Sequence, residues 1–282
     1  MLKICQSILF YLVIIWLLPI SSSLSQSDDY IGIIPPFHNR EALSNNETQV
    51  ELNRQLFILF AYKNAVAVYS ESDFINNSDN FVDQEFSLPS TGYDVNGDDP
   101  GGRLSNGIWN VQLWIQGERN NPQFIRDGSE EWYTVRAKFD PHENLKIKAL
   151  FWAETSLTDI DSLPGFDTTI IVNGKRGFLI DLGHAAIWNN VIESITTFVV
   201  LHDGVNSGNN NFSAVPETYQ EEDSTLTWDM EYIEPSESDN IIVNYESEEK
   251  NDSTSNTMAE LSSFIVKYVY DQLLDYADQL NN

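Results

Sequence analysis

The sequence has almost no cysteine, and its one cysteine lies where it cannot serve the mature fold. Cys5 is the only cysteine in 282 residues, and it falls inside the apolar stretch at the N-terminus. Removal of residues 1–25 as a signal peptide would leave a chain with no thiol. A disulfide framework, a thiolate metal site and a cysteine nucleophile are then excluded, so stability has to come from the hydrophobic core.

Basic residues are also scarce. The chain has 15 lysine and arginine residues against 43 aspartate and glutamate residues, which gives a formal net charge of −28. Binding to nucleic acid or to an anionic membrane surface requires many cationic contacts, so this charge speaks against both kinds of partner. Basic proteins, metal cations and neutral ligands remain compatible with it.

Catalytic signatures are missing as well. The four histidines are scattered, and no serine-hydrolase elbow, zinc-protease helix motif or glycine-rich phosphate loop occurs. A glycoside hydrolase would need two carboxylates that flank the scissile bond, but no spacing singles out a pair. The eligible carboxylates are Glu118, Glu130, Glu154 and Asp181. The sequence therefore leans toward a protein without enzymatic activity.

A secretion signal is predicted at the N-terminus. Lys3 supplies a short positive region, Ile8–Ile20 is apolar almost without interruption, and Ser21–Ser25 is small and polar. This order is typical of a signal peptide cut before Gln26, and the mature chain is then expected to have no stable membrane span. An uncleaved signal anchor is the alternative, because the apolar stretch approaches the length of a span. The expected location is the cell exterior or the lumen of the secretory pathway.

Four Asn-x-Ser/Thr sequons are compatible with the same route. Each sequon falls in a polar segment that we interpret as a loop, where a glycan is tolerated. The predicted glycan acceptors are Asn46, Asn76, Asn211 and Asn251. The protein is therefore expected to be an acidic glycoprotein.

Alternation of apolar and polar residues predicts an all-β domain over residues 50–246. Successive side chains of a strand point to opposite faces, so this period indicates strands with a buried face. Asn173-Gly174 between two apolar runs is a hairpin signal. About ten strands without helix alternation favour an antiparallel β-sandwich or jelly roll. The predicted strands span residues 55–61, 65–69, 81–88, 107–116, 132–139, 145–153, 168–172, 175–182, 194–202, 226–233 and 241–245.

The segments around this domain differ in character. Residues 26–49 contain two adjacent prolines and predict an extended lead-in, and the polar residues 247–256 predict a linker. Residues 257–282 predict a C-terminal amphipathic helix, which must bury its apolar stripe on the domain's own sheets or against a partner. The stripe consists of Leu261, Ile265, Val269, Leu273, Tyr276 and Leu280.

One strand carries a polar and aromatic face that suits a carbohydrate. In residues 107–116 we place Trp109, Val111, Leu113 and Ile115 on the apolar side. The other side combines amides with an indole, and flat aromatic groups stack on sugar rings while amides and carboxylates bond to the hydroxyls. The same residue types also suit an ordinary packed or half-exposed sheet face. The candidate ligand-binding residues are Asn110, Gln112, Trp114, Trp152 and Glu154.

A short acidic loop resembles the start of a calcium-binding loop. Asp94, Asn96 and Asp98 place oxygen ligands at alternate positions, as a hard cation requires. However, Asp99 stands where the turn glycine belongs, and Ser105 stands where a bidentate glutamate is needed. The three residues are the candidate metal ligands, while the departures favour a solvated loop and no cofactor.

Taken together, the sequence favours a secreted or lumenal binding module for a carbohydrate or a protein partner. A glycan-active hydrolase that uses paired carboxylates is the first alternative. A lumenal assembly subunit that engages its partners through the C-terminal helix is the second.

Overall fold

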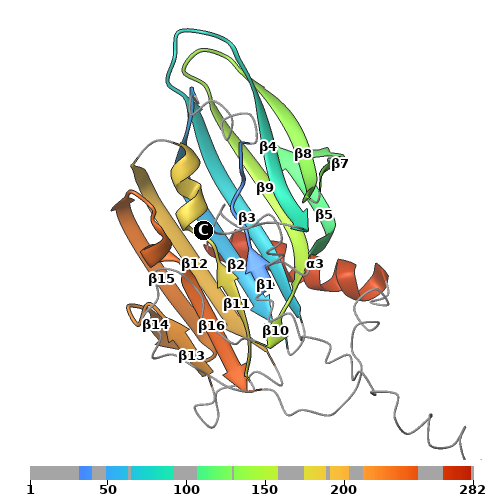
Figure 1. Cartoon of the computed structure of the whole chain (residues 1–282), viewed down its shortest axis with the longest axis vertical. Coiled ribbons are helices and arrows are strands. Elements are labelled where there is room, and N and C mark those ends of the chain that lie inside the picture. Colours follow the sequence, from blue (N-terminus) through green and yellow to red (C-terminus); the bar gives the residue numbers. More distant parts are fainter. Residues whose placement is uncertain are drawn as a thin grey trace, which may run out of the picture.

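The computed structural model describes residues 32–39, 49–62, 65–91, 107–128, 130–157, 175–188, 191–202, 212–246 and 263–280. The predicted signal peptide and polar linker lie outside these residues. Most of the described chain forms strands, and one α-helix, α3 (Ser263–Leu280), follows at its C-terminal end (Figure 1). The prediction of an all-β fold with a C-terminal helix is confirmed. The described residues hold sixteen strands, more than predicted, because six short strands carry too few residues to alternate visibly.

The largest sheet, which we call the central sheet, has eight strands in the order β14-β15-β12-β2-β3-β9-β5-β6. Most neighbours are antiparallel, whereas β12 and β2 run parallel and are therefore joined by a long crossover. β2 and β3 pair as a long antiparallel hairpin, in agreement with the strands predicted at residues 55–61 and 65–69. The strands are β14 (Gln220–Glu222), β15 (Thr225–Ile233), β12 (Ile192–Leu201), β2 (Val50–Ala61), β3 (Ala65–Asn76), β9 (Asn144–Glu154), β5 (Ile108–Ile115) and β6 (Glu118–Asn120).

Two smaller sheets accompany it. One has the order β1-β11-β16-β13 with β10 also paired to β11, and the other has the order β4-β8-β7. The first strand and the turn of the hairpin predicted at Asn173-Gly174 lie outside the described residues. Among the described strands, β11 pairs with β1, β10 and β16. The strands are β1 (Gly32–Ile34), β11 (Lys175–Ile180), β16 (Ile241–Glu246), β13 (Phe212–Val215), β10 (Ser156–Leu157), β4 (Val82–Thr91), β8 (Glu130–Phe139) and β7 (Gln123–Asp127). Two 3₁₀ turns, η1 (Gly183–Trp188) and η2 (Glu237–Asp239), complete the fold.

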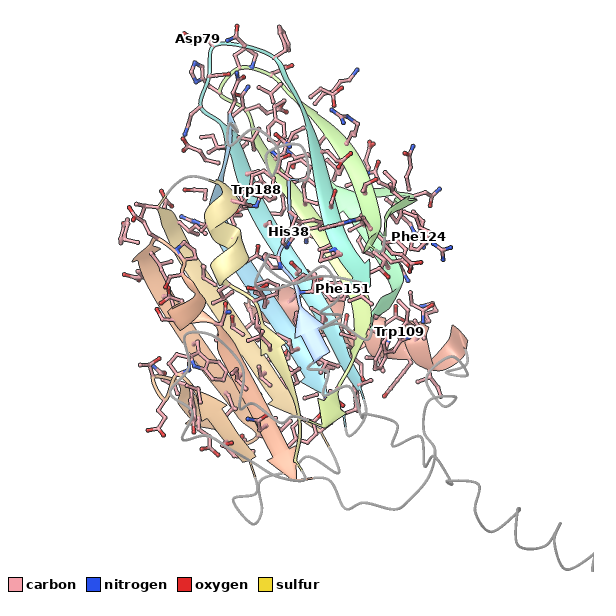
Figure 2. The ribbon with its side chains drawn as sticks, in the orientation of Figure 1. His38, Asp79, Trp109, Phe124, Phe151 and Trp188 are labelled. Carbon is pink, nitrogen blue, oxygen red and sulfur yellow. The ribbon has the colours of Figure 1, made fainter. Side chains whose placement is uncertain are left out.

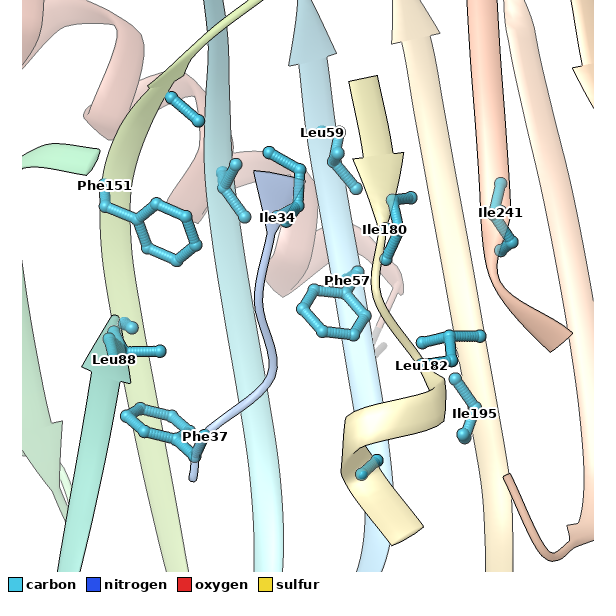
Figure 3. Close-up of a cluster of buried hydrophobic side chains, with 14 of the residues drawn as sticks. Ile34, Phe37, Phe57, Leu59, Leu88, Phe151, Ile180, Leu182, Ile195 and Ile241 are labelled. Atoms are coloured by element: carbon cyan, nitrogen blue, oxygen red, sulfur yellow. The ribbon is translucent and has the colours of Figure 1, made fainter. Parts of the chain in front are cut away.

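The main core lies between one face of the central sheet and both smaller sheets. Phe57, Leu59 and Phe151 of the central sheet face Ile34 and Ile180, which belong to the smaller sheet that contains β1 and β11 (Figure 3). The alternating apolar residues predicted for residues 145–153 all belong to this core. Burial of a large aliphatic or aromatic side chain stabilises the fold by about 1.5–3 kcal/mol, so this continuous layer is the main source of stability.

A second apolar layer covers part of the opposite face, which we call the outer face. Val266, Val269, Tyr270, Leu273 and Ala277 of α3 are buried against it. The prediction that the helix docks on the domain's own sheet is confirmed, and Val269 and Leu273 belong to the predicted stripe. The prediction was wrong for Ile265 and Leu280, which are 43% and 42% exposed. The buried stripe is rotated from the predicted one, and it includes Tyr270, which stacks on Trp152 of the sheet.

The part of the outer face that lies under α3 consists of apolar residues. They lie on adjacent strands and alternate with the main-core residues, as strand geometry requires. The buried members are Ile58, Phe60, Ala65, Ala67, Tyr69, Leu150 and Trp152.

A β-bulge corrects the predicted orientation of Trp109. Trp109 pairs with Trp152 and Gln112 pairs with Leu150, so β5 has one residue more than β9 between these pairs. Asn110 provides the left-handed backbone that the bulge needs, with a φ of 57°. An extra residue reverses the faces of the residues before it, so Trp109 lies on the outer face and not beside Leu113. The alternation in the sequence could not reveal this shift.

The pairing of β11 with β16 predicts a strong effect of one methyl group. A Cβ on Gly177 would lie 2.5 Å from the carbonyl oxygen of Val243 and 2.3 Å from Oδ1 of Asn244. Gly177→Ala should therefore lower the free energy of unfolding by about 3 kcal/mol, measured by urea denaturation. Gly128→Ala is the control, because its Cβ meets open space and only its φ of 63° costs about 1 kcal/mol. Equal losses for the two variants would contradict this account.

Candidate functional site

The outer face of the central sheet is divided into a covered half and an open half. Helix α3 covers the half with the aromatic residues and ends at Leu280. Beyond this end lie two adjoining hollows of about 310 and 410 Å³, which share Arg54, Asp73 and Lys146 and together form a groove. The first hollow is also lined by Gln55, Leu56, Glu71, Ser194, Thr196, Phe198 and Leu280. The second is also lined by Asn53, Phe74, Gln116, Asn144 and Leu145.

The strand register gathers the charged residues of the groove. Glu71 is opposite Lys148, and Asp73 is opposite Lys146, across β3 and β9. Glu71 accepts hydrogen bonds from Lys146 and from the hydroxyl of Tyr69, and its Oε2 lies 3.0 Å from Nζ of Lys148. Nζ of Lys146 lies 3.7 Å from Oδ1 of Asp73. Directly opposed residues of opposite charge stabilise a sheet, so this cluster fixes the floor of the groove.

The two carboxyl groups of the floor are shifted in opposite directions. Burial raises the pKa of Glu71, but hydrogen bonds from Lys146, Tyr69 and Lys148 outweigh burial, and the pKa lies below its usual value. Burial raises the pKa of Asp73 above its usual value despite the charge of Lys146. For Lys146, the bond with Glu71 outweighs the effect of burial and raises its pKa. Glu71 and Lys146 are therefore both held in the charged state.

Charges balance among the residues of the first hollow. Arg54 and Lys146 carry two positive charges, and Glu71 and Asp73 carry two negative charges. Ser194 and Thr196 add hydroxyl groups, while the ring of Phe198 adds an apolar wall. In a chain of net charge −28, this groove is a compensated surface with donors, acceptors and one aromatic ring.

The predicted carbohydrate face is largely unavailable. Trp152 is 3% exposed and stacks against Tyr270 of α3, with ring centroids 6.5 Å apart. Trp114 is half-buried and packs beside the same cluster. Gln112 is half-buried opposite Leu150. Helix α3 therefore covers Trp152, while Gln112 and Trp114 keep part of their surface exposed.

The remaining predicted ligand residues are scattered. Asn110 is exposed, and its carbonyl oxygen accepts a hydrogen bond of 2.9 Å from the hydroxyl of Tyr270. Glu154 ends β9 opposite Ala65. Asp94, Asn96 and Asp98 lie outside the described residues. In the part of the chain that the structure describes, no cluster of three or more histidine, aspartate or glutamate residues is arranged to hold a metal ion.

Arg54, Glu71 and Asp73 were not among the residues predicted for the site. Glu71 and Asp73 lie beyond the predicted end of their strand at residue 69, and nothing local showed that β3 continues to Asn76. The partners of Lys146 depend on the register of β3 against β9, which the sequence does not show. The available signal was the alternation of Glu71 with Asp73 and of Lys146 with Lys148.

Asn76, one of the predicted glycan acceptors, is buried and hydrogen-bonded. Its side chain is 0% exposed, and Nδ2 donates hydrogen bonds of 2.7 and 2.9 Å to the carbonyl oxygens of Asn80 and Asp140. A glycan on Nδ2 would break both bonds and could not fit in the folded chain. Asn46, Asn211 and Asn251 lie outside the described residues and stay predictions.

Comparisons with known proteins give a likeness of fold. No family model and no curated protein matches the chain. A proposed nutrient-binding protein of Legionella pneumophila is 12% identical with a TM-score of 0.52, over 77% of this chain and 72% of that chain. At this identity the likeness concerns the fold alone.

Two groups of enzymes match less well. An M1 zinc metallopeptidase of Deinococcus radiodurans is 13% identical with a TM-score of 0.40, over 69% of this chain and 42% of that chain. Yeast LTA4 hydrolase is 10% identical with a TM-score of 0.40, over 70% of this chain and 29% of that chain. The chain spans less than half the length of these enzymes, and TM-scores this low carry no argument about activity.

The ion pairs of Glu71 predict a loss of stability in acid. Its lowered pKa means that its contribution is present above the usual carboxyl pKa and disappears as the pH falls through the folded value. Glu71→Gln should lower the free energy of unfolding at pH 7 by about 1–3 kcal/mol and should weaken its dependence on pH below 5. Urea denaturation between pH 3 and 7 measures both effects.

The matched control for this variant is Glu193→Gln. Glu193 pairs with Arg54 at 3.4 Å on the exposed surface, where an ion pair contributes about 0–1 kcal/mol. An equal effect of both substitutions would show that burial and the second lysine add nothing at Glu71.

Burial of Asn76 predicts that the folded, exported protein carries no glycan there. Peptide mapping after enzymatic deglycosylation in oxygen-18 water should show the mass label of a former glycan at other sequons but not at Asn76. The peptides with Asn46, Asn211 and Asn251 serve as internal comparison. A labelled Asn76 in the folded protein would contradict the hydrogen bonds described above.

Proposed function

We propose that the protein is a non-enzymatic, secreted or lumenal binding module that takes a neutral carbohydrate in the open groove. The observation that carries this proposal is the balanced set of lining residues, with two positive and two negative side chains beside hydroxyl groups. A charged ligand would have to compete with the existing ion pairs. A neutral sugar leaves them intact and uses their free donor and acceptor positions.

The size and the walls of the groove fit the same ligand. A volume of about 310 Å³ lies at the lower end of the range for small-molecule sites. Phe198 is half-buried and offers an aromatic surface to the C–H groups of a sugar ring. Glu71 fixes the position of Lys146, so the floor is already ordered before a ligand arrives, which lowers the entropy cost of binding.

Two further findings are compatible with ligand binding. One solved structure of similar fold is a proposed nutrient-binding protein, which makes a small molecule the first class of ligand to test. Among the described residues, no helix has both the length and the apolar character needed to cross a membrane. The predicted signal peptide and sequons remain the basis for the proposed location.

Paired carboxylates keep a glycan-active hydrolase as the second candidate function. Glu71 and Asp73 are two residues apart on one strand, so their side chains lie on the same face about 7 Å apart along it. Inverting glycosidases hold their carboxyl groups about 6.5–9.5 Å apart. The raised pKa of Asp73 suits a proton donor. Glu71, however, is already bonded to two lysines and a tyrosine, which disfavours its use as a base.

A glycan array with the purified full chain, followed by calorimetry with the strongest neutral oligosaccharide, tests the binding function. Lys146→Ala and Thr196→Trp should each weaken binding at least about tenfold, because one removes a donor and the other fills the groove. Lys138→Ala is the matched control, since Lys138 is exposed on β8 in another sheet. Unchanged affinity in both groove variants, or no binding to any neutral glycan, would contradict the proposal.

The hydrolase alternative is separated by product analysis of the same oligosaccharide. Binding without cleavage supports the module. Cleavage that Asp73→Asn abolishes while the sugar still binds would replace it with the hydrolase.

A further inference from the structure

The covered half of the outer face contains two buried donors without acceptors. Trp152 is 3% exposed, and Trp109 is half-buried. Nε1 of each indole is shielded from solvent and has no hydrogen-bond partner. A buried donor that stays unpaired costs about 1–3 kcal/mol, so an ordinary packed core would be expected to supply an acceptor.

The aromatic groups around these indoles form a stack. The rings of Trp109 and Trp152 are 6.5 Å apart at an angle of 20°, and Tyr62 lies 5.7 Å from Trp152. Figure 2 shows Trp109 beside α3 at the end of the sheet. Burial raises the pKa of Tyr62 to about 12, so its hydroxyl is neutral in this cluster. We call these three side chains the aromatic platform.

Tyr270 of α3 makes the two kinds of contact that a bound sugar ring would make with the platform, namely stacking and a hydrogen bond. Its ring stacks on Trp152 at an angle of 26°, and its hydroxyl donates to the carbonyl oxygen of Asn110. The acceptor is the left-handed residue of the bulge, and bulges occur often beside binding sites. Tyr270 has no acceptor that reaches either indole, so the platform is only partly satisfied.

Helix α3 is held on the platform by its apolar stripe and has little support of its own. Its first turn has no acidic residue, and its last turn has no basic residue. Asp275 and Asp278 instead lie near the negative end of the helix dipole, which is unfavourable. A single ion pair, Lys267 with Asp271, lies on the exposed side of the described helix. The free energy of undocking therefore consists mainly of the lost apolar contacts. Once undocked, the helix has few contacts of its own to stabilise it.

We propose that Tyr270 occupies a second carbohydrate subsite, in which the platform stacks on a neutral sugar ring whose oxygens accept from Trp109 and Trp152 after α3 moves away. The inference rests on the proposed function for its class of ligand, but it concerns different residues. Helix α3 runs from the platform at Tyr270 to the groove at Leu280, so an oligosaccharide bound in both places would have to take the place of this part of the helix. The helix then competes with the outer part of the ligand.

The test uses the full chain and two variants of α3. Leu273→Asp places a charge at a position that is 0% exposed and undocks the helix, while Tyr270→Ala removes the ring and leaves the other helix contacts in place. Ile265→Asp is the control, because Ile265 is half-exposed on the same helix. Tryptophan emission with acrylamide quenching reports the exposure of the indoles, and circular dichroism reports the fold.

Cellotetraose, maltotetraose and tetraacetylchitotetraose are the probes, titrated by calorimetry. Tyr270→Ala and Leu273→Asp should bind at least one of them about tenfold more tightly than the wild type and the control. Exposed indoles without a gain in affinity for any probe would overturn the inference. If Leu273→Asp fails to fold, the result for Tyr270→Ala alone decides.

The same variants separate this inference from the proposed function. In the Tyr270→Ala background, Thr196→Trp should remove the groove's share of the affinity and leave the gain from the platform. No gain in Tyr270→Ala, with wild-type binding still sensitive to Thr196→Trp, would sink the subsite and leave the groove standing. A gain in Tyr270→Ala without any effect of Thr196→Trp would sink the groove and leave the subsite.

Discussion

The structure depends on a central sheet whose middle strands are apolar on both faces. Phe57 and Leu59 of β2 face the main core, while Ile58 and Phe60 between them face α3. A strand of this kind is most stable with cover on both faces, because a face left in water loses the hydrophobic contribution of its residues. Two smaller sheets cover one face and a helix covers half of the other, and the open remainder carries the charged groove.

This requirement explains which parts of the fold could be read from the sequence. The alternation in residues 145–153 predicted the buried face of β9 correctly, because side chains at i and i+2 always share a face. The C-terminal helix was predicted because its apolar residues recur at helical spacing. The consecutive apolar residues Phe57–Phe60 indicate that β2 is buried on both faces. A sheet with one face in water would show alternation there instead.

The candidate site depends on features that local sequence does not contain. The bulge at Asn110 reverses the face of Trp109, and no alternation rule can locate an extra residue in one strand of a pair. The ion pairs of Glu71 join β3 to β9 across 75 and 77 positions of chain, so they follow from register and not from spacing. The helix took the place of the predicted sugar face for a related reason. An indole on a sheet packs well against another aromatic ring, and Tyr270 of α3 provides that ring for Trp152.

The central claim is that the outer face has a covered and an open half, and hydrogen exchange of the full chain tests it most directly. The account predicts that amides of the middle strands β2, β3, β9 and β12 exchange slowest, and that amides of α3 around Tyr270 and Leu273 are strongly protected although they lie near the C-terminus. Exchange of these helix amides at the rate of an isolated peptide helix would contradict it, because the aromatic platform would then be uncovered in the free protein.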